Sequence, residues 1–132
     1  MDASRKLKPG LSHQMEFVVE EEHSAAHLGS GSMRVLSTPS MILFMERTAR
    51  IMMDEYLPDT HTSVGVQVNV RHLAPSPVGN RVRAEAEITS VDGNKITLDV
   101  AVWDGEVKVG GGQHERFVID KERFLRRFNE SK

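Results

Sequence analysis

The chain has 132 residues, of which 39% are hydrophobic and 27% are charged. These values are typical of one globular domain, so we expect residues 1–132 to form a single domain with its core at about 12–120. The net charge of -2 argues against a nucleic-acid partner, and the lack of cysteine excludes disulfides, thiolate metal sites and a cysteine nucleophile. Because the first ten residues lack an apolar leader and no apolar run is long enough to span a membrane, we expect a cytoplasmic protein with no membrane partner.

The first predicted elements are a strand and a long loop. Residues 12–20 alternate Met15, Phe17 and Val19 with polar neighbours, which predicts a half-buried strand. Residues 23–37 are rich in glycine and serine, which predicts a loop with room for one helical turn. Long loops inside a compact domain often cover a functional site.

A central helix is predicted next. The Ser-Thr-Pro sequence at 37–39 is typical of a helix start, because a hydroxyl can cap the helix and proline is tolerated in its first turn. The pattern ends after about Tyr56, where Pro58 follows. Residues 41–45 form an unbroken apolar run, and a helix that is apolar on most sides must be enclosed by other structure.

The rest of the chain has the pattern of an antiparallel sheet. Gly93 and Gly105 each follow an aspartate and mark hairpins, because glycine readily adopts the positive φ of tight turns. The prolines within 74–77 predict a corner, and the glycines at 110–112 predict a bulge or a close backbone approach. The four predicted strands are 64–73, 80–91, 95–103 and 106–119.

Together these elements predict an α+β fold. One strand, one apolar helix and four further antiparallel strands can bury the helix only if the sheet curls around it, which is the hot-dog architecture. A short helix at about 121–129, capped by Asp120, completes the chain. Edge-to-edge pairing of two such sheets would cover an exposed edge strand, so we expect a homodimer or a higher homo-oligomer.

His72 is the first candidate for chemistry. The valines at 64, 66, 68 and 70 occupy alternate positions of one predicted strand, and His72 is the next residue in phase with them. Such an imidazole is either a core histidine that is hydrogen-bonded to a carbonyl or a desolvated acid or base.

Two residues of the predicted helix also have alternative explanations. Glu46 lies within the apolar part of the helix, where desolvation would raise its pKa and suit it to base chemistry. Alternatively, Glu46 is solvated and pairs with Arg50 one turn later. Thr38 would be explained fully by helix capping.

Several motifs, in this order and spacing, resemble the fluoroacetyl-CoA thioesterase-like branch of the hot-dog superfamily. The resemblance runs from about Phe17 to about Phe124. It implies that Thr38, Glu46 and His72 form the active site and that Gly65 helps to accommodate the acyl group. The motifs are Ala26-His27-Leu28, the segment 35–41, Met45-Glu46 eight residues beyond Thr38, Val70-Arg71-His72 and His114-Glu115-Arg116.

One feature differs from the fluoroacetyl-specific member, which carries a lid of phenylalanines in the loop before the helix. The corresponding loop here offers Gly29, Gly31, Ser32 and Met33. The resemblance therefore predicts hydrolysis of a small or medium acyl-CoA and does not extend to fluoroacetyl selectivity. The substrate would bring coenzyme A, and no other cofactor is expected.

The residue types fit thioester hydrolysis. Glu46 would attack the carbonyl or activate water, His72 would transfer protons, and Thr38 would fix the acyl group or the water. Pro39 is a candidate substrate contact at the helix start, where backbone N–H groups can stabilise an oxyanion. Eight residues of helix separate Thr38 from Glu46 by roughly 12 Å, so they contact opposite ends of the acyl group or a second subunit completes the site.

Other candidates and functions carry less weight. His23 and His27 have a spacing that could ligate a metal on a helix, but the local Gly-Ser composition argues against it, and no metal is expected. The residues 114–116 are interpreted as cross-strand structural pairs. A non-catalytic acyl-CoA binding or sensing domain with the same fold is the alternative function. The Asp/His arrangement of a hot-dog hydratase is not found.

Overall fold

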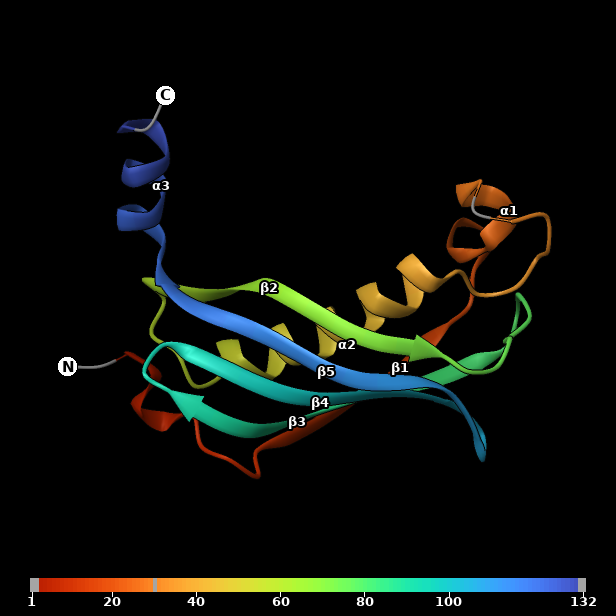
Figure 1. Ribbon diagram of the computed structural model, residues 1–132, viewed down its shortest axis with the longest axis horizontal. Helices are drawn as coiled ribbons and strands as arrows, with labels where there is room; N and C mark the ends of the chain where they lie inside the picture. Colours follow the sequence, from red (N-terminus) through yellow and green to blue (C-terminus); the bar gives the residue numbers. More distant parts are fainter. Residues whose placement is uncertain (1–2, 30, 131–132) are drawn as a thin grey trace.

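A curved five-stranded antiparallel sheet wraps around one long helix in the computed structural model, which describes residues 3–29 and 31–130 (Figure 1). The strand order is β1-β3-β4-β5-β2, which leaves β1 and β2 at the edges. This arrangement confirms the predicted α+β hot-dog fold. The strands are β1 (Ser12–Val18), β2 (His61–His72), β3 (Arg81–Asp92), β4 (Lys95–Asp104) and β5 (Val107–Asp120).

The central helix α2 (Thr38–Asp54) forms the core with the concave face of the sheet. Ser37 caps it, since its hydroxyl accepts a hydrogen bond from the Ser40 N–H at 3.1 Å. Phe44 is fully buried and stacks on Phe17 of β1, with ring centroids 4.3 Å apart. Each such buried apolar side chain contributes about 1.5–3 kcal/mol. The predicted central helix is therefore confirmed.

The segment before α2 contains two short helices, η2 (Glu21–His23) and α1 (Ala25–Leu28). Isolated bridges pair Ser24 with Leu36 and Val35 with Pro77. The predicted loop thus contains helical turns, and it is fastened to the corner that follows β2.

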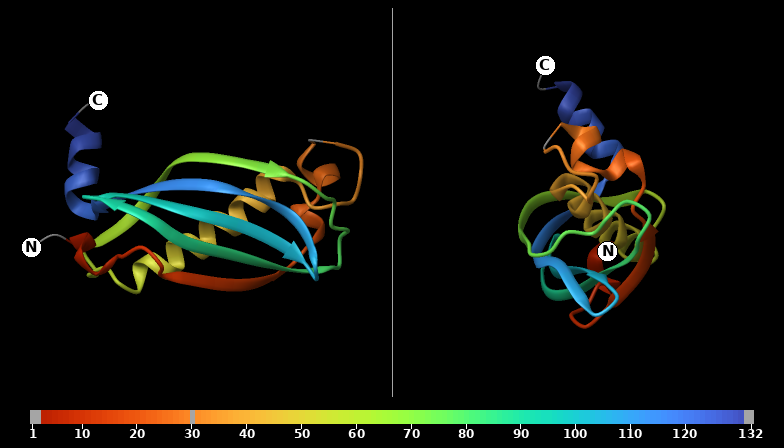
Figure 2. Two further views of the ribbon diagram at one scale, coloured as in Figure 1. Left: turned by 60° about the horizontal axis from the view of Figure 1, so that its bottom comes forward. Right: turned by 90° about the vertical axis from the view of Figure 1, so that its right-hand side faces the viewer.

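Short helices also begin and end the described chain, at η1 (Ala3–Lys6) and α3 (Lys121–Glu130). Asp120 caps α3 as predicted, because its carboxylate accepts from the Arg123 N–H at 3.0 Å. The views in Figures 1 and 2 agree that α3 and α1 project on the same side of the sheet, from opposite ends of it. None of the helices in the described ranges has both the length and the apolar character needed to cross a membrane.

The valine row of β2 does not lie on one face, so that part of the sequence interpretation is wrong. The register between β2 and β5 shifts just after Gly65, which makes Val66 an extra, bulged residue. Val64 before the bulge and Val68 after it therefore point to opposite faces of the sheet. His72 remains in phase with Val68.

The bulge also places Gly65 and His72 on the same face. Their positions differ by an odd number, so a regular strand would point them to opposite faces. Their partners on β5 are Arg116 and Gly110, whose positions differ by an even number. Gly65 and His72 consequently both face α2.

Candidate active site

Thr38 and His72 are in direct contact. Thr38 is the first residue of α2 and His72 is the last of β2, and Thr38 Oγ1 lies 2.8 Å from His72 Nδ1. Capping does not explain Thr38, because Ser37 supplies the cap. The hydroxyl of Thr38 is therefore directed to the imidazole.

The imidazole of His72 is half-buried and keeps one ring nitrogen unused. Burial lowers the pKa of His72, and a backbone interaction with Ala74 opposes that shift. Its Nε2 is buried and has no hydrogen-bond partner within residues 3–29 and 31–130. A neutral imidazole with a second nitrogen available is suited to accept or deliver a proton.

Glu46 lies elsewhere on α2, beside Arg116 of β5. Its Oε2 is 3.6 Å from Arg116 Nη1, and its side chain is 37% exposed. Arg50 pairs with Asp54 instead, at 3.0 Å, so the alternative in which Glu46 pairs with Arg50 is wrong. Glu46 thus combines solvent access with a buried cationic neighbour.

A network of hydrogen bonds holds the guanidinium of Arg116. Its Nε donates to Ser63 Oγ at 2.7 Å, its Nη2 donates to the Ser63 carbonyl at 2.9 Å, and its Nη1 lies 3.1 Å from His114 Nε2. His114 Nδ1 lies 2.9 Å from the carbonyl oxygen of Gln67, which can only accept. Nδ1 therefore carries the ring proton, and Nε2 accepts from Arg116. Burial lowers the pKa of His114, which favours this neutral ring.

His114 and Arg116 are functional candidates that the sequence reasoning missed. Cross-strand contacts agree with their interpretation as structural pairs, because both side chains bond to β2 and Glu115 pairs with Lys95 at 3.5 Å. Both are also buried, and the sequence reasoning did not place them beside Glu46. A signal was present in the sequence, because positions 114 and 116 are in phase with the apolar Val118.

Gly65 provides the space that the carboxylate of Glu46 occupies. A Cβ at this position would lie 2.5 Å from Glu46 Oε2, 3.1 Å from His114 Cε1 and 3.4 Å from Arg116 Nη1. Any side chain here would displace Glu46. The glycine is therefore required for the close approach of helix and strand.

The five predicted site residues form two separate groups within one chain. Thr38 and His72 make one group, with the exposed Pro39 next to Thr38. Glu46 and Gly65 make the other, about two turns further along α2, or roughly 12 Å. A hollow of about 320 Å³ adjoins the second group, and its lining comprises Leu43, Glu46, Arg47, Arg50 and Arg116.

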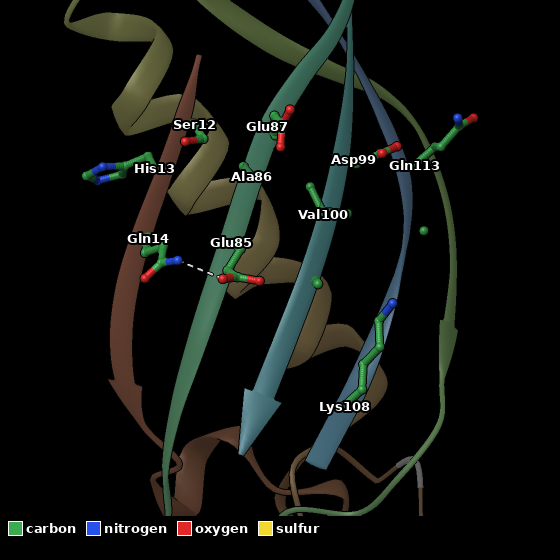
Figure 3. A pocket seen from close by; sticks show the side chains of 12 residues that line it. Ser12, His13, Gln14, Glu85, Ala86, Glu87, Asp99, Val100, Lys108 and Gln113 are labelled. Carbon is green, nitrogen blue, oxygen red and sulfur yellow. Dashed lines mark hydrogen bonds between the residues drawn. The ribbon is translucent and has the colours of Figure 1, made fainter. Parts of the chain in front are cut away.

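A larger hollow, of about 470 Å³, lies on the outer face of the sheet and contains none of the predicted residues (Figure 3). Glu85 and Glu87 project into it, and α2 lies behind the sheet in this view. Gln14 donates to Glu85 at 2.7 Å. This open polar surface offers no hydroxyl–imidazole contact comparable to that of Thr38 and His72.

The histidines considered for a metal have other roles or positions. His23 Nδ1 accepts from the Glu20 N–H at 3.0 Å, and its ring packs edge-on against Phe44. His27 lies in α1 and is exposed. The part of the chain that the structure describes contains no group of three or more His, Cys, Asp or Glu side chains placed to hold a metal ion.

Comparisons with known proteins agree with this fold. The family model described as fluoroacetyl-CoA-specific thioesterase matches residues 19–122. A fluoroacetyl-CoA thioesterase from Streptantibioticus cattleyicolor is 34% identical over 124 residues, which cover 89% of each chain. A mutant fluoroacetyl-CoA thioesterase solved in complex with acetyl-CoA has a TM-score of 0.87 at 30% identity, covering 96% of this chain and 99% of its own.

Two further solved structures extend the comparison. A hot-dog-like protein from Thermanaerovibrio acidaminovorans has a TM-score of 0.89 at 26% identity, with 99% of this chain and 97% of that chain covered. A thioesterase superfamily member from Thermus thermophilus has a TM-score of 0.84 at 27% identity, with 96% of each chain covered. From the extent of the family match and the identity to the curated relative, the chain belongs to the fluoroacetyl-CoA-specific thioesterase family.

Proposed function

We propose that this protein is an acyl-CoA thioesterase that hydrolyses a small or medium acyl-CoA to the free acid and coenzyme A. The observation that carries the proposal is the 2.8 Å contact between Thr38 and His72, whose Nε2 is buried with no hydrogen-bond partner among the described residues. The family membership and the acetyl-CoA complex of a relative support the same substrate class. No resident cofactor or metal is needed for this chemistry, and we place the enzyme in the cytoplasm.

In the proposed reaction, Glu46 takes a proton from a water molecule that attacks the thioester carbonyl, or Glu46 attacks the carbonyl itself and water then hydrolyses the resulting anhydride. The C–S bond breaks, the departing CoA thiolate takes a proton from His72, and the ring regains a proton that the attacking water has released. Thr38 orients the acyl group or the water through its hydroxyl. Backbone N–H groups in the first turn of α2 could stabilise the oxyanion. Of its first three residues, Ser40 already donates its N–H to Ser37 and Pro39 has none, so the available donor is the N–H of Thr38.

A homodimer would unite the two groups of residues. β2 is an edge strand whose residues 65–69 are all exposed, which is a surface prone to pair with another strand (Figure 1). If the β2 strands of two protomers paired antiparallel with the two-fold axis at Gln67, His72 would lie opposite the partner's Thr62. That position is next to Ser63, which holds Arg116. The Thr38–His72 pair of one protomer would then face the Glu46 group of the other. Two identical sites would result from the two-fold symmetry.

The enzymatic step is tested by thiol release across a panel of short and medium acyl-CoA esters. We expect release by the wild-type protein and a loss of about 10²–10⁴-fold in kcat for Glu46→Gln and for His72→Ala, with folding unchanged. Saturable acyl-CoA binding without thiol release would instead establish the non-catalytic binding function. Full activity in both folded variants would refute the proposed roles of the two residues.

Mixing the two inactive variants tests whether the site is shared. A mixed dimer of Glu46→Gln and His72→Ala chains has one fully intact site if residues of two protomers combine, and none if each chain forms its own site. After subunit exchange, we expect the mixture to regain about a quarter of the wild-type activity. An inactive mixture, with exchange verified by mass, would place the complete site in one chain.

A further inference from the structure

The C-terminal helix α3 carries large apolar side chains that are exposed to solvent, among them Phe124 and Leu125. Phe124, Leu125 and Phe128 are 46%, 59% and 54% exposed, and none of the residues of α3, all of which are described, is buried. Their spacing puts them on one side of the helix. The helix also carries four basic residues against two acidic ones. An exposed apolar stripe beside basic side chains is suited to an acidic, partly apolar partner.

A second exposed patch, which has the complementary character, precedes α2. We call it the α1 patch, formed by residues 20–28 and 31–34. It exposes Leu28 and Met33, at 46% and 65%, and its first three residues are exposed glutamates. Only one of these carboxylates, that of Glu21, pairs with Arg34.

Both patches are anchored near β2, at opposite ends of it. At the start of β2, the Lys121 N–H of α3 donates to the Thr60 carbonyl at 2.9 Å. Beyond the end of β2, the Val78 N–H donates to the Arg34 carbonyl at 3.2 Å, which ties the α1 patch to the segment that follows β2. Figures 1 and 2 show α3 and α1 on the same side of the sheet but at opposite ends of it, so they do not meet within one chain.

Antiparallel pairing of two β2 edges would bring these ends together. The start of β2 in one protomer then lies beside the end of β2 in the other, with α3 of the first next to the α1 patch of the second. We propose that α3 docks on the α1 patch of a second copy of this chain, with Phe124 and Leu125 against Leu28 and Met33. The basic residues of α3 would face the glutamates of the patch. The inference rests on the proposed homodimer, and the contact occurs twice in it.

This contact would also affect the surroundings of Thr38 and His72. The α1 patch leads through residues 35–37 directly into Thr38, whose hydroxyl touches His72. A helix held over the α1 patch would therefore fix the segment that borders this pair. The partner would then hold the segment that precedes Thr38 as well as contribute Glu46.

Cysteine cross-linking tests the contact cleanly, because the chain has no native cysteine. The variant Leu28→Cys/Leu125→Cys, treated with a short bis-maleimide, should yield covalent dimers on a denaturing gel. The matched control is Leu125→Cys/Val107→Cys, in which the second cysteine replaces another exposed apolar residue, 54% exposed, at the β4–β5 hairpin. The control and each single variant should remain monomeric on the gel.

The solution mass separates the possible failures. A dimeric mass with no cross-link in the Leu28→Cys/Leu125→Cys variant would overturn the docking of α3 and leave the dimeric thioesterase standing. Cross-linking by Leu125→Cys alone would also overturn it, because α3 would then contact the partner's α3. A monomeric mass with wild-type thiol release would overturn both the docking and the shared site, whereas the enzymatic function would stand.

Discussion

Glu46 packs closely against Gly65, and this contact gives a quantitative prediction for Gly65→Ala. The new Cβ would lie 2.5 Å from Glu46 Oε2, whereas ordinary contacts begin at 3.4 Å. The carboxylate must therefore move by roughly 0.9 Å, and a misplacement of about 1 Å costs about 10²-fold in rate. This corresponds to about 2.7 kcal/mol of lost transition-state stabilisation.

The same substitution should have little effect on folding. The atom that must move most is the end of a flexible side chain, and replacing a strand glycine by alanine reduces the freedom of the unfolded chain. We therefore expect the free energy of unfolding to change by no more than about 1 kcal/mol. Thiol release gives kcat/KM, and denaturant titration gives the stability.

Gly111→Ala is the matched control for this prediction. Its Cβ would meet the flexible end of Lys108 at 2.8 Å and the Val100 carbonyl oxygen at 3.2 Å, on the adjoining strand, and Glu46 is not among its neighbours. It should retain wild-type kcat/KM. If Gly65→Ala also retained it while folded, the close approach of Glu46 to β2 would have no part in the reaction. If both variants lost activity in parallel with stability, the effect would be structural.

Three further predictions concern capping, the arginine network and pH. Ser37→Ala removes the cap of α2 and should lower the free energy of unfolding by about 1 kcal/mol. Thr38→Val keeps the cap and should lower kcat/KM by at least about tenfold. Equal stability losses of the two variants in denaturant titrations would contradict the assignment of the cap to Ser37 alone. His114→Leu removes the acceptor that holds Arg116 and should cost about 1–3 kcal/mol of stability and lower kcat/KM. His114→Gln keeps an acceptor oxygen and should recover part of both losses. Identical stability and kcat/KM of the two variants would argue against the hydrogen-bond network around Arg116. Burial lowers the pKa of His72 and of His114 from 6.5. Below about pH 6.5 the folded state therefore binds fewer protons than the unfolded state. The free energy of unfolding should fall as the pH decreases from about 6.5 to the lowered pKa values of the folded state. A stability flat between about pH 7 and 5 in both the wild-type protein and His114→Gln would contradict this sign.

Local signals in the sequence were sufficient for the helix and the hairpins. The Ser-Thr-Pro start and Pro58 bound α2 to within about two residues, and Gly93 and Gly105 lie in the two tight turns with φ of 60°. These features depend on neighbouring residues alone, so the chain itself carries the information. The Thr38–His72 contact was foreseen only through the family resemblance, because it joins elements 34 residues apart.

The surroundings of Glu46 were not predicted, for a different reason. Periodicity offered Arg50 as its partner one turn away, but Arg50 pairs with Asp54, which also accepts from Thr62 of β2. The cation that does approach Glu46 comes from β5. Which of two arginines a carboxylate meets is decided by the packing of the helix on the sheet, and a pattern along one helix does not contain that information.

The bulge at Val66 shows how one extra residue can place two site residues of a strand on the same face. An alternating row of valines favours a regular strand, and a regular strand would have turned Gly65 away from α2, because it is an odd number of positions from His72. The extra residue reverses the phase, so that the glycine admits Glu46 from the helix while His72 still reaches Thr38 at the far end. It is also part of the exposed run by which a second β2 would pair. The bulge, which the alternating pattern did not predict, therefore allows one strand to contribute to both groups of site residues. In the proposed dimer, each group would be completed by the other protomer.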